Sequence, residues 1–224
     1  VKGMIPEQNQ ILAEYFNTIH NVSLMNIAII TGPCHAEEIA LERLSYLTVA
    51  SENQDLAATI KGLLKTHYTE VNISDDIYGT EYAAVLKNIY AITAGICHGL
   101  GYGDNFLAVL ISNAIREMKT FVDKVHPIQR DIKSSAYLGD LLVTAYSKFS
   151  RNRIFGNMIG KGYSVNTALL EMKMIPEGYY ALKSIFQIIS DQTIKLPVIE
   201  STYNILYKSE SPSVEIKLLT KHLN

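Results

Sequence analysis

The chain has 224 residues, of which 48% are apolar and 19% charged, a composition that supports a sizeable hydrophobic core and excludes global disorder. At roughly 150 residues per domain, this length allows one large domain or one and a half ordinary ones. The 20 Lys and Arg residues against 22 Asp and Glu residues leave a formal net charge of −2, which argues against a general nucleic-acid or acidic-membrane binder.

Short β-rich runs alternate with helical patterns in the first third of the chain. The expected strands are residues 26–30, 46–50 and 68–73. Apolar residues recur at helical spacing in three segments, where we expect helices: 7–19, 36–43 and 54–66. This α/β organisation has too few strands to close a doubly wound sheet.

Helical patterns fill almost all of the chain after about residue 78. The expected helices are 79–97, 105–125, 135–146, 151–161, 165–172, 177–190, 198–206 and 214–222. The sequence therefore predicts a mainly α fold, in which an all-helical domain follows a short α/β segment.

Motifs for several common sites are missing from the sequence. The Gly-rich stretch 99–103 follows an expected helix rather than a strand, and 156–162 has the wrong spacing for a phosphate-binding loop, so we interpret both as turns or helix ends. The six histidines never stand at i, i+4 on one helix, which argues against a zinc site. We therefore expect no bound metal.

The expected location is a reducing, cytoplasmic one. Two cysteines, Cys34 and Cys97, cannot form a disulfide framework. The least charged stretch, 82–99, carries Lys87 and His98, which predicts a buried helix rather than a membrane span. The first residues show neither an initiator Met nor the pattern of a signal peptide.

Lys87 is the most informative residue of the sequence. It is the single charge of residues 83–92, a stretch of the expected helix 79–97 that is apolar on most of its circumference and is therefore expected to be buried. Burial can lower the pKa of a lysine by several units, so that the side chain exchanges protons near neutral pH. The alternative is a partly exposed or structurally paired lysine.

Two further segments offer partners for Lys87 and for an anion. Asp140 and Thr144 stand at i, i+4 on one helical face, where their carboxylate and hydroxyl can meet Lys87. Ser150 is a good N-cap that places Arg151 and Asn152 in the first turn of a helix, an arrangement suited to a phosphate. An ordinary cap with solvated arginines would give the same pattern.

Taken in chain order, these segments resemble the bacterial NAD(P)-dependent sn-glycerol-3-phosphate dehydrogenases. The matching motifs are Lys2-Gly3, Gly32-Pro33-Cys34-His35-Ala36-Glu37, Leu86-Lys87-Asn88, Gly139-Asp140-Leu141, Ser150-Arg151-Asn152-Arg153 and Glu177-Gly178-Tyr179. The resemblance spans nearly all of this chain but only the later part of a family member. It implies that residues 1–77 are the last α/β units of a Rossmann domain that binds NAD(P). It also implies that residues 78–224 form an all-helical substrate-binding and catalytic domain, similar to the C-terminal domain of 6-phosphogluconate dehydrogenase.

The resemblance also implies a reaction and a set of site residues. The reaction is hydride transfer between NAD(P)H and dihydroxyacetone phosphate, giving sn-glycerol 3-phosphate for phospholipid synthesis, in a homodimer. Lys87 is implied as the proton donor and acceptor. The implied substrate-binding residues are Lys2, Gly32, Cys34, Asn88, Asp140, Thr144, Ser150, Arg151 and Asn152. The implied cofactor-binding residues are Ala36, Arg151, Ile175 and Glu177.

Two departures from the family pattern and two alternatives accompany this interpretation. Cys34 replaces the usual hydroxyl or amide side chain, and Pro176 alters the entry to the helix of Glu177. One alternative is a 3-hydroxyacid or 6-phosphogluconate dehydrogenase, against which the motif 150–152 argues. The other is a non-catalytic helical dimerisation module, because the Gly-rich turn of the Rossmann domain does not occur in this chain. For the same reason we expect the chain alone to be nearly inactive.

Overall fold

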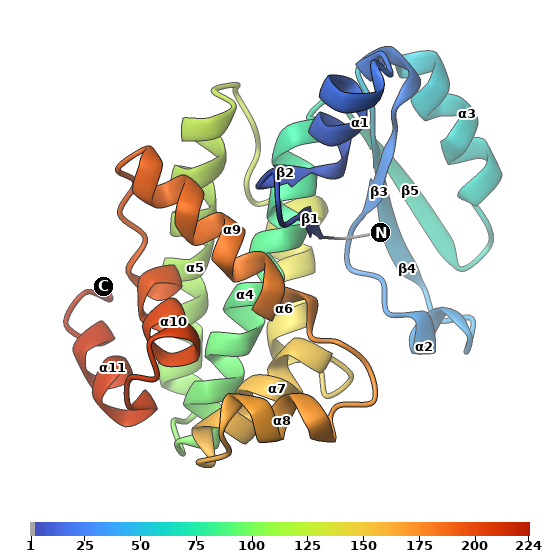
Figure 1. Ribbon diagram of the computed structural model, residues 1–224. Helices are drawn as coiled ribbons and strands as arrows, with labels where there is room; N and C mark the ends of the chain where they lie inside the picture. The colour runs from blue at the N-terminus through green and yellow to red at the C-terminus, as the bar shows by residue number, and fades with distance from the viewer. Residues whose placement is uncertain (1–2) are drawn as a thin grey trace.

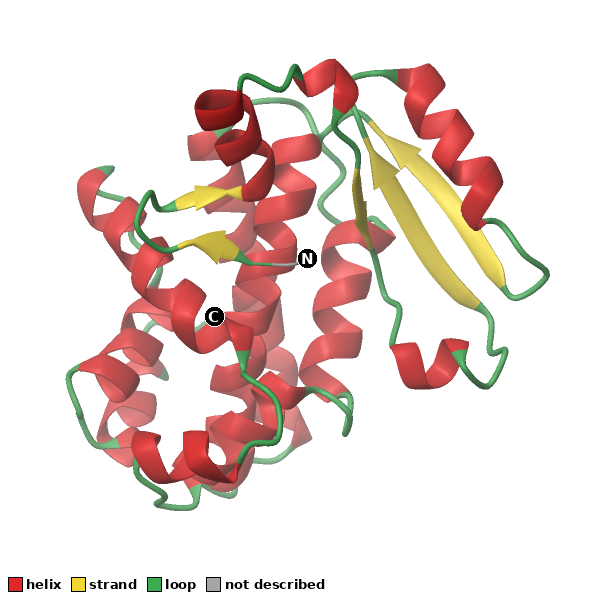
Figure 2. Ribbon diagram, turned by 45° about the vertical axis from the view of Figure 1, so that its right-hand side comes forward, coloured by secondary structure: helices red, strands yellow, loops and turns green. Residues whose placement is uncertain are grey.

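The computed structural model describes residues 3–224 and shows a small sheet beside a larger group of helices (Figures 1 and 2). The elements of the first part are β1 (Met4–Ile5), β2 (Gln10–Ile11), α1 (Leu12–His20), β3 (Ile29–Thr31), α2 (Ala36–Ile39), β4 (Ser45–Ala50), α3 (Gln54–Leu64) and β5 (Thr69–Ser74). The helices that follow are α4 (Ile77–Gly99), α5 (Asp104–Val125), α6 (Asp140–Tyr146), α7 (Arg151–Gly160), α8 (Val165–Glu171), α9 (Glu177–Asp191), α10 (Pro197–Tyr207) and α11 (Pro212–Leu219). The predicted fold class, mainly helical with a short α/β segment in front, is confirmed.

The three-stranded sheet has the order β3-β4-β5 and two kinds of pairing. β3 runs antiparallel to β4, and β4 runs parallel to β5 through the crossover helix α3. Val49 of β4 and Val71 of β5 point to the same face of the sheet, where they pack with Ala57 of α3 in a small core. The opposite face carries Thr31 and contacts the helices around α4.

Helix α4 is the centre of the main core, and 20 of its 23 residues are buried. Its sequence is apolar almost all round, so it is stable only when other helices surround it, and α5, α6, α7, α9 and α10 do so. Fully buried side chains such as Leu86, Ile89 and Ile92 each contribute roughly 2 kcal/mol of transfer free energy. The Asp76 carboxylate accepts a hydrogen bond from the Gly79 amide at 2.8 Å and so caps the start of the helix.

Glycines allow α4 and α7 to touch backbone to backbone. A Cβ atom on Gly156 would lie 2.0 Å from the carbonyl oxygen of Ile92, and one on Gly95 would lie 2.1 Å from that of Arg153. Gly160 meets the following turn of α4 in the same way, so the two helices run in the same direction. The interpretation of 156–162 as a turn or helix end is therefore wrong for its first residues, which lie inside α7.

The first helix begins at Leu12 rather than at residue 7, because the preceding residues form a hairpin of β1 and β2. Pro6 and Asn9, whose φ is 53°, suit the tight turn between the strands. The buried carboxylate of Glu81 then accepts hydrogen bonds from the amides of Leu12 and Ala13, at 3.2 and 3.1 Å. This contact from another element fixes where α1 starts.

Other boundaries differ from the sequence predictions for local reasons. Ser23 caps a short 3₁₀ turn, Leu24–Asn26, so β3 starts later than expected. The helix predicted over 36–43 ends at Ile39, and Glu42 has a left-handed φ of 55°. The helix predicted over 135–146 begins with a π-helical turn, Ser135–Gly139.

Candidate active site

A buried ion pair joins the middle of α4 to the start of α6. The Lys87 ammonium contacts the Asp140 carboxylate, and these two residues are only 6% and 1% exposed. An ammonium on a helix that is apolar nearly all round needs a carboxylate within reach, because burying an unpaired charge is very costly. The contact that we expected between these two residues is present.

Two hydroxyl groups hold the Asp140 carboxylate in place. The Thr31 hydroxyl, at the end of β3, donates to Oδ2 at 3.4 Å. The Thr144 hydroxyl lies 3.5 Å from Oδ1 and donates to the Asp140 backbone carbonyl at 2.6 Å. The carboxylate is thus oriented from β3, α4 and α6 together, and it orients the ammonium of Lys87 in turn.

The ion pair forms part of the wall of a cavity of about 430 Å³. The N-terminus of α7 forms another part, where the Ser150 hydroxyl accepts a hydrogen bond from the Arg153 amide at 3.3 Å. Arg151 lies in the first turn of this helix and lines the same cavity as Lys87. Helix amides, a guanidinium and an ammonium around one small cavity favour an anionic ligand.

Most of the residues named from the sequence meet at this cavity. Ten of them line it: Cys34, Ala36, Lys87, Asn88, Asp140, Thr144, Ser150, Arg151, Asn152 and Glu177. Gly32 does not line it. Gly32 has a φ of 121°, and a Cβ atom at this position would lie 2.7 Å from the Tyr46 carbonyl oxygen, so glycine suits the turn that leads to Cys34. Ile175 is 61% exposed and also lies outside the cavity wall. Lys2 lies outside the described residues.

The structure adds cavity residues to which the sequence analysis assigned no role. They are His35, Glu37, Val143, Phe149 and Met174. Each of them lies next to a residue with an assigned role, and His35 and Glu37 also stand in the motif 32–37. The Nε2 atom of His35 is buried and has no hydrogen-bond partner in the described part of the chain.

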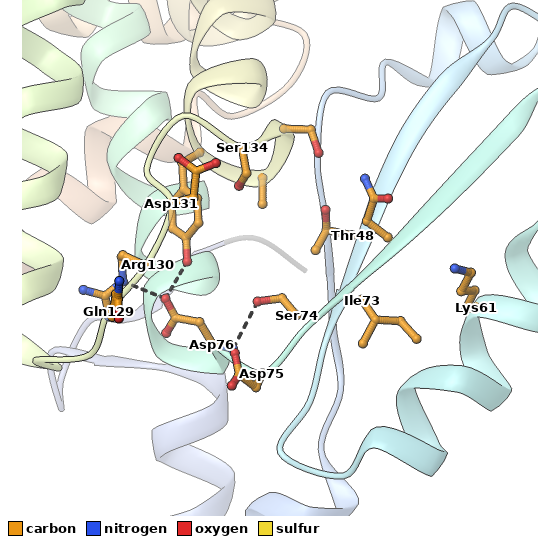
Figure 3. Close-up of a pocket in the computed structure, with 14 residues that line it drawn as sticks. Thr48, Lys61, Ile73, Ser74, Asp75, Asp76, Gln129, Arg130, Asp131 and Ser134 are labelled. Carbon is orange, nitrogen blue, oxygen red and sulfur yellow. Dashed lines mark hydrogen bonds and ion pairs between the residues drawn. The ribbon is translucent and has the colours of Figure 1, made fainter.

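A second cavity, of about 420 Å³, lies beside the end of β5 and is lined by Asp76, Arg130 and Tyr137 among others (Figure 3). The buried polar groups of Asp76, Arg130 and Tyr137 make hydrogen bonds within the protein. The Arg130 Nε donates to the Asp76 carboxylate at 2.8 Å, the Tyr137 hydroxyl also donates to Asp76, and Arg130 Nη2 donates to the His126 carbonyl at 2.7 Å. Burial raises the pKa of Tyr137, so the phenol keeps its proton. These groups hold the segment after α5 against the start of α4, and their hydrogen bonds are made to one another rather than to a ligand.

Comparison with known proteins points to one family along most of the chain. Residues 76–217 match the model of the NAD-dependent glycerol-3-phosphate dehydrogenase C-terminus, and residues 1–57 match the model of the N-terminus of the same family. In the described residues, no helix is both long and apolar enough to cross a membrane.

Individual relatives and a solved structure agree with these family models. The chain is 34% identical over 221 residues to a glycerol-3-phosphate dehydrogenase [NAD(P)+] of Exiguobacterium, covering 98% of this chain and 65% of that protein. It is 35% identical to the Enterococcus faecalis protein of the same name, covering 82% of this chain and 54% of the relative. The crystal structure of glycerol-3-phosphate dehydrogenase from Coxiella burnetii superposes with a TM-score of 0.93 at 29% identity, covering 98% of this chain and 66% of that one. The chain thus spans between about half and two thirds of the length of these proteins.

Proposed function

This chain belongs to the NAD-dependent glycerol-3-phosphate dehydrogenase family, and from that premise we propose that the protein interconverts dihydroxyacetone phosphate and sn-glycerol 3-phosphate with NAD(H) or NADP(H). The observation that carries the proposal is that Lys87, Asp140 and Arg151 line one cavity. Both matching family models describe glycerol-3-phosphate dehydrogenases, which favours this reaction over that of a 3-hydroxyacid or 6-phosphogluconate dehydrogenase.

The cavity residues fit the substrate together with the nicotinamide end of the cofactor. A volume of about 430 Å³ lies in the range of small-molecule sites. Glu177 and Ala36, the residues expected to contact the cofactor, line the cavity. When bound, a reduced nicotinamide supplies a hydride for the carbonyl carbon of the substrate.

Lys87 supplies the proton for the same reaction. As the substrate carbonyl oxygen gains negative charge, the ammonium stabilises that charge and then donates a proton to form the hydroxyl group. In the reverse direction, the neutral amine of Lys87 accepts the hydroxyl proton. Asp140, held by the Thr31 and Thr144 hydroxyls, keeps Lys87 aimed into the cavity.

The start of α7 binds the phosphate in this proposal. Arg151 donates to the phosphate oxygens, and the Ser150 and Asn152 side chains flank it at the positive end of the helix dipole. The protein has a net charge of −2, so the attraction for a phosphate dianion is local to this cavity. Cys34 and Asn88 line the cavity beside the three-carbon chain.

The remaining expectations from the resemblance belong to the same proposal. Residues 1–77 are the end of a Rossmann domain and 78–224 the substrate domain. Lys2 and Gly32 contribute to substrate binding, and Ile175 contacts the cofactor. The protein acts as a cytoplasmic homodimer.

The test uses protein expressed from the complete reading frame that contains this chain. We expect oxidation of NADH or NADPH, followed at 340 nm, to depend on dihydroxyacetone phosphate. Lys87→Met should lower kcat by about 10²–10⁴-fold because the proton donor is lost. Lys183→Met, on the exposed face of α9, is the matched control and should keep wild-type rates. Full turnover in Lys87→Met, or no reaction in the wild type, would overturn the proposal.

A further inference from the structure

We propose that Asn152 is a positioning residue whose side-chain oxygen caps α9 from a distance and thereby holds Glu177 at a fixed place relative to Lys87. The part of this proposal that concerns the cofactor rests on the proposed function. The capping itself rests on the geometry alone.

Helix α9 begins without a cap of its own. Its N-cap residue is Pro176, whose side chain accepts no hydrogen bond from the first turn. The Gly178 amide is buried and donates instead to Oδ1 of Asn152 at 2.9 Å, from a residue 26 positions earlier in the chain. Asn152 lies in the first turn of α7 and is only 8% exposed, so water does not compete for this oxygen. One buried amide thus ties the starts of α7 and α9 together.

Gly178 also brings α9 into direct contact with α4. A Cβ atom at this position would lie 2.7 Å from the carbonyl carbon and oxygen of Asn88, the residue after Lys87. It would also lie 3.0 Å from Oδ1 of Asn152. Because the obstacle is backbone, any side chain at Gly178 would push the start of α9 away from the turn that carries Lys87.

The consequence concerns Glu177, which precedes Gly178 and lines the same cavity as Lys87. The hydrogen bond from Asn152 and the close contact with Asn88 fix this turn from two helices. The two ends of the Asn152 amide then have separate roles: Oδ1 holds α9, and Nδ2, which makes no hydrogen bond within residues 3–224, is left for a ligand of the cavity that Asn152 lines. Substitutions can separate these tasks, because aspartate keeps the acceptor and loses the donor.

The capping is tested on the 224-residue chain by hydrogen exchange of the Gly178 amide. We expect Asn152→Ala to speed this exchange at least about tenfold relative to neighbouring amides of α9, and Asn152→Asp to keep it within about twofold of wild type. Equal exchange in the wild type and in Asn152→Ala would overturn the remote cap. This measurement needs neither cofactor nor activity, so it decides the capping even if the proposed function fails.

The positioning role is tested by steady-state kinetics on the protein from the complete reading frame. Gly178→Ala should raise the KM for NADH about tenfold and change the KM for dihydroxyacetone phosphate less than twofold. Asn152→Asp should do the reverse, because it keeps the cap but places a negative charge beside the phosphate, and Asn152→Ala should raise both KM values. The matched control is Gly62→Ala in α3, where a Cβ atom meets nothing within 4 Å. An unchanged NADH KM in both Gly178→Ala and Asn152→Ala would refute the positioning role, whereas an inactive wild type would instead refute the proposed function.

Discussion

Removing one partner of the Lys87–Asp140 ion pair should lower the free energy of unfolding far more than removing both partners. Asp140→Asn leaves a buried ammonium without its carboxylate, and Lys87→Met leaves a buried carboxylate without its ammonium. The two side chains are 7% and 2% exposed, so water cannot replace the missing partner. The double variant removes both charges and keeps similar side-chain volumes.

The expected magnitudes follow from the burial of the pair. Each single substitution should lower the free energy of unfolding by about 3–5 kcal/mol, the usual cost of an uncompensated buried charge. That is a large part of a total stability of about 5–15 kcal/mol. In the double variant, the Thr31 and Thr144 hydroxyls still face the amide at position 140, so we expect stability within about 1 kcal/mol of wild type. The two substitutions should therefore be strongly non-additive.

Urea unfolding of the wild type, the two single variants and the double variant at pH 7 measures this cycle. Lys183→Met, which removes an exposed lysine of α9, is the control and should change stability by less than about 0.5 kcal/mol. Additive losses, or single-variant losses below about 1 kcal/mol, would refute the reasoning, because they would mean that solvent reaches the pair.

Two further predictions concern the helical core. Gly156→Ala should destabilise the protein by about 1–3 kcal/mol because its Cβ would lie 2.0 Å from the Ile92 carbonyl oxygen. The control Gly62→Ala should be neutral or stabilising, because a Cβ atom there meets nothing within 4 Å. Equal Tm values for the two variants would contradict the close contact between α4 and α7. Burial raises the pKa of Glu117, which accepts a hydrogen bond from the Val198 amide, from 4.5 to about 8. The folded state therefore holds this proton more tightly than the unfolded state, so the contribution of Glu117 to stability is greatest below about pH 4.5 and is lost as the pH rises to about 8. Urea midpoints of Glu117→Gln should lack this fall, and parallel pH profiles for variant and wild type would contradict the assignment.

The sequence could predict the central ion pair because local patterns mark both partners. Lys87 is conspicuous as the single charge of residues 83–92, the apolar middle of a long helix, and such a stretch is buried whatever surrounds it. The i, i+4 spacing of Asp140 and Thr144 places their polar atoms on one face, where the structure has them. The sequence does not show that Thr31, at the end of a predicted strand, meets Asp140, since the two residues are 109 positions apart.

Helix boundaries and cavity residues that depend on distant contacts could not be predicted from the sequence. The apolar spacing of residues 7–19 predicts a helix, but Glu81 caps that helix at Leu12 from 69 residues further along. A local pattern shows which residues suit a helix and not which distant carboxylate caps its start. The cavity residue Phe149 was missed for the same reason, because it stands in no pattern that points to a ligand.

Pro176 and the glycines of α7 are visible in the sequence, but their structural roles depend on contacts with residues elsewhere in the chain. Proline before Glu177 removes the local cap of α9, and the compensating acceptor is Asn152, which reaches Gly178 only because α7 starts beside the turn of α4 that carries Lys87. That placement depends on glycines four residues apart on both helices, at 95 and 99 and at 156 and 160, which let the two backbones touch. A spacing of four puts residues on one helical face, so paired glycines of this kind predict close helix contact rather than a turn. Replacing Pro176 with serine should therefore give α9 a local cap and make the stability of the protein less sensitive to Asn152→Ala, a coupling that a double-mutant cycle measures.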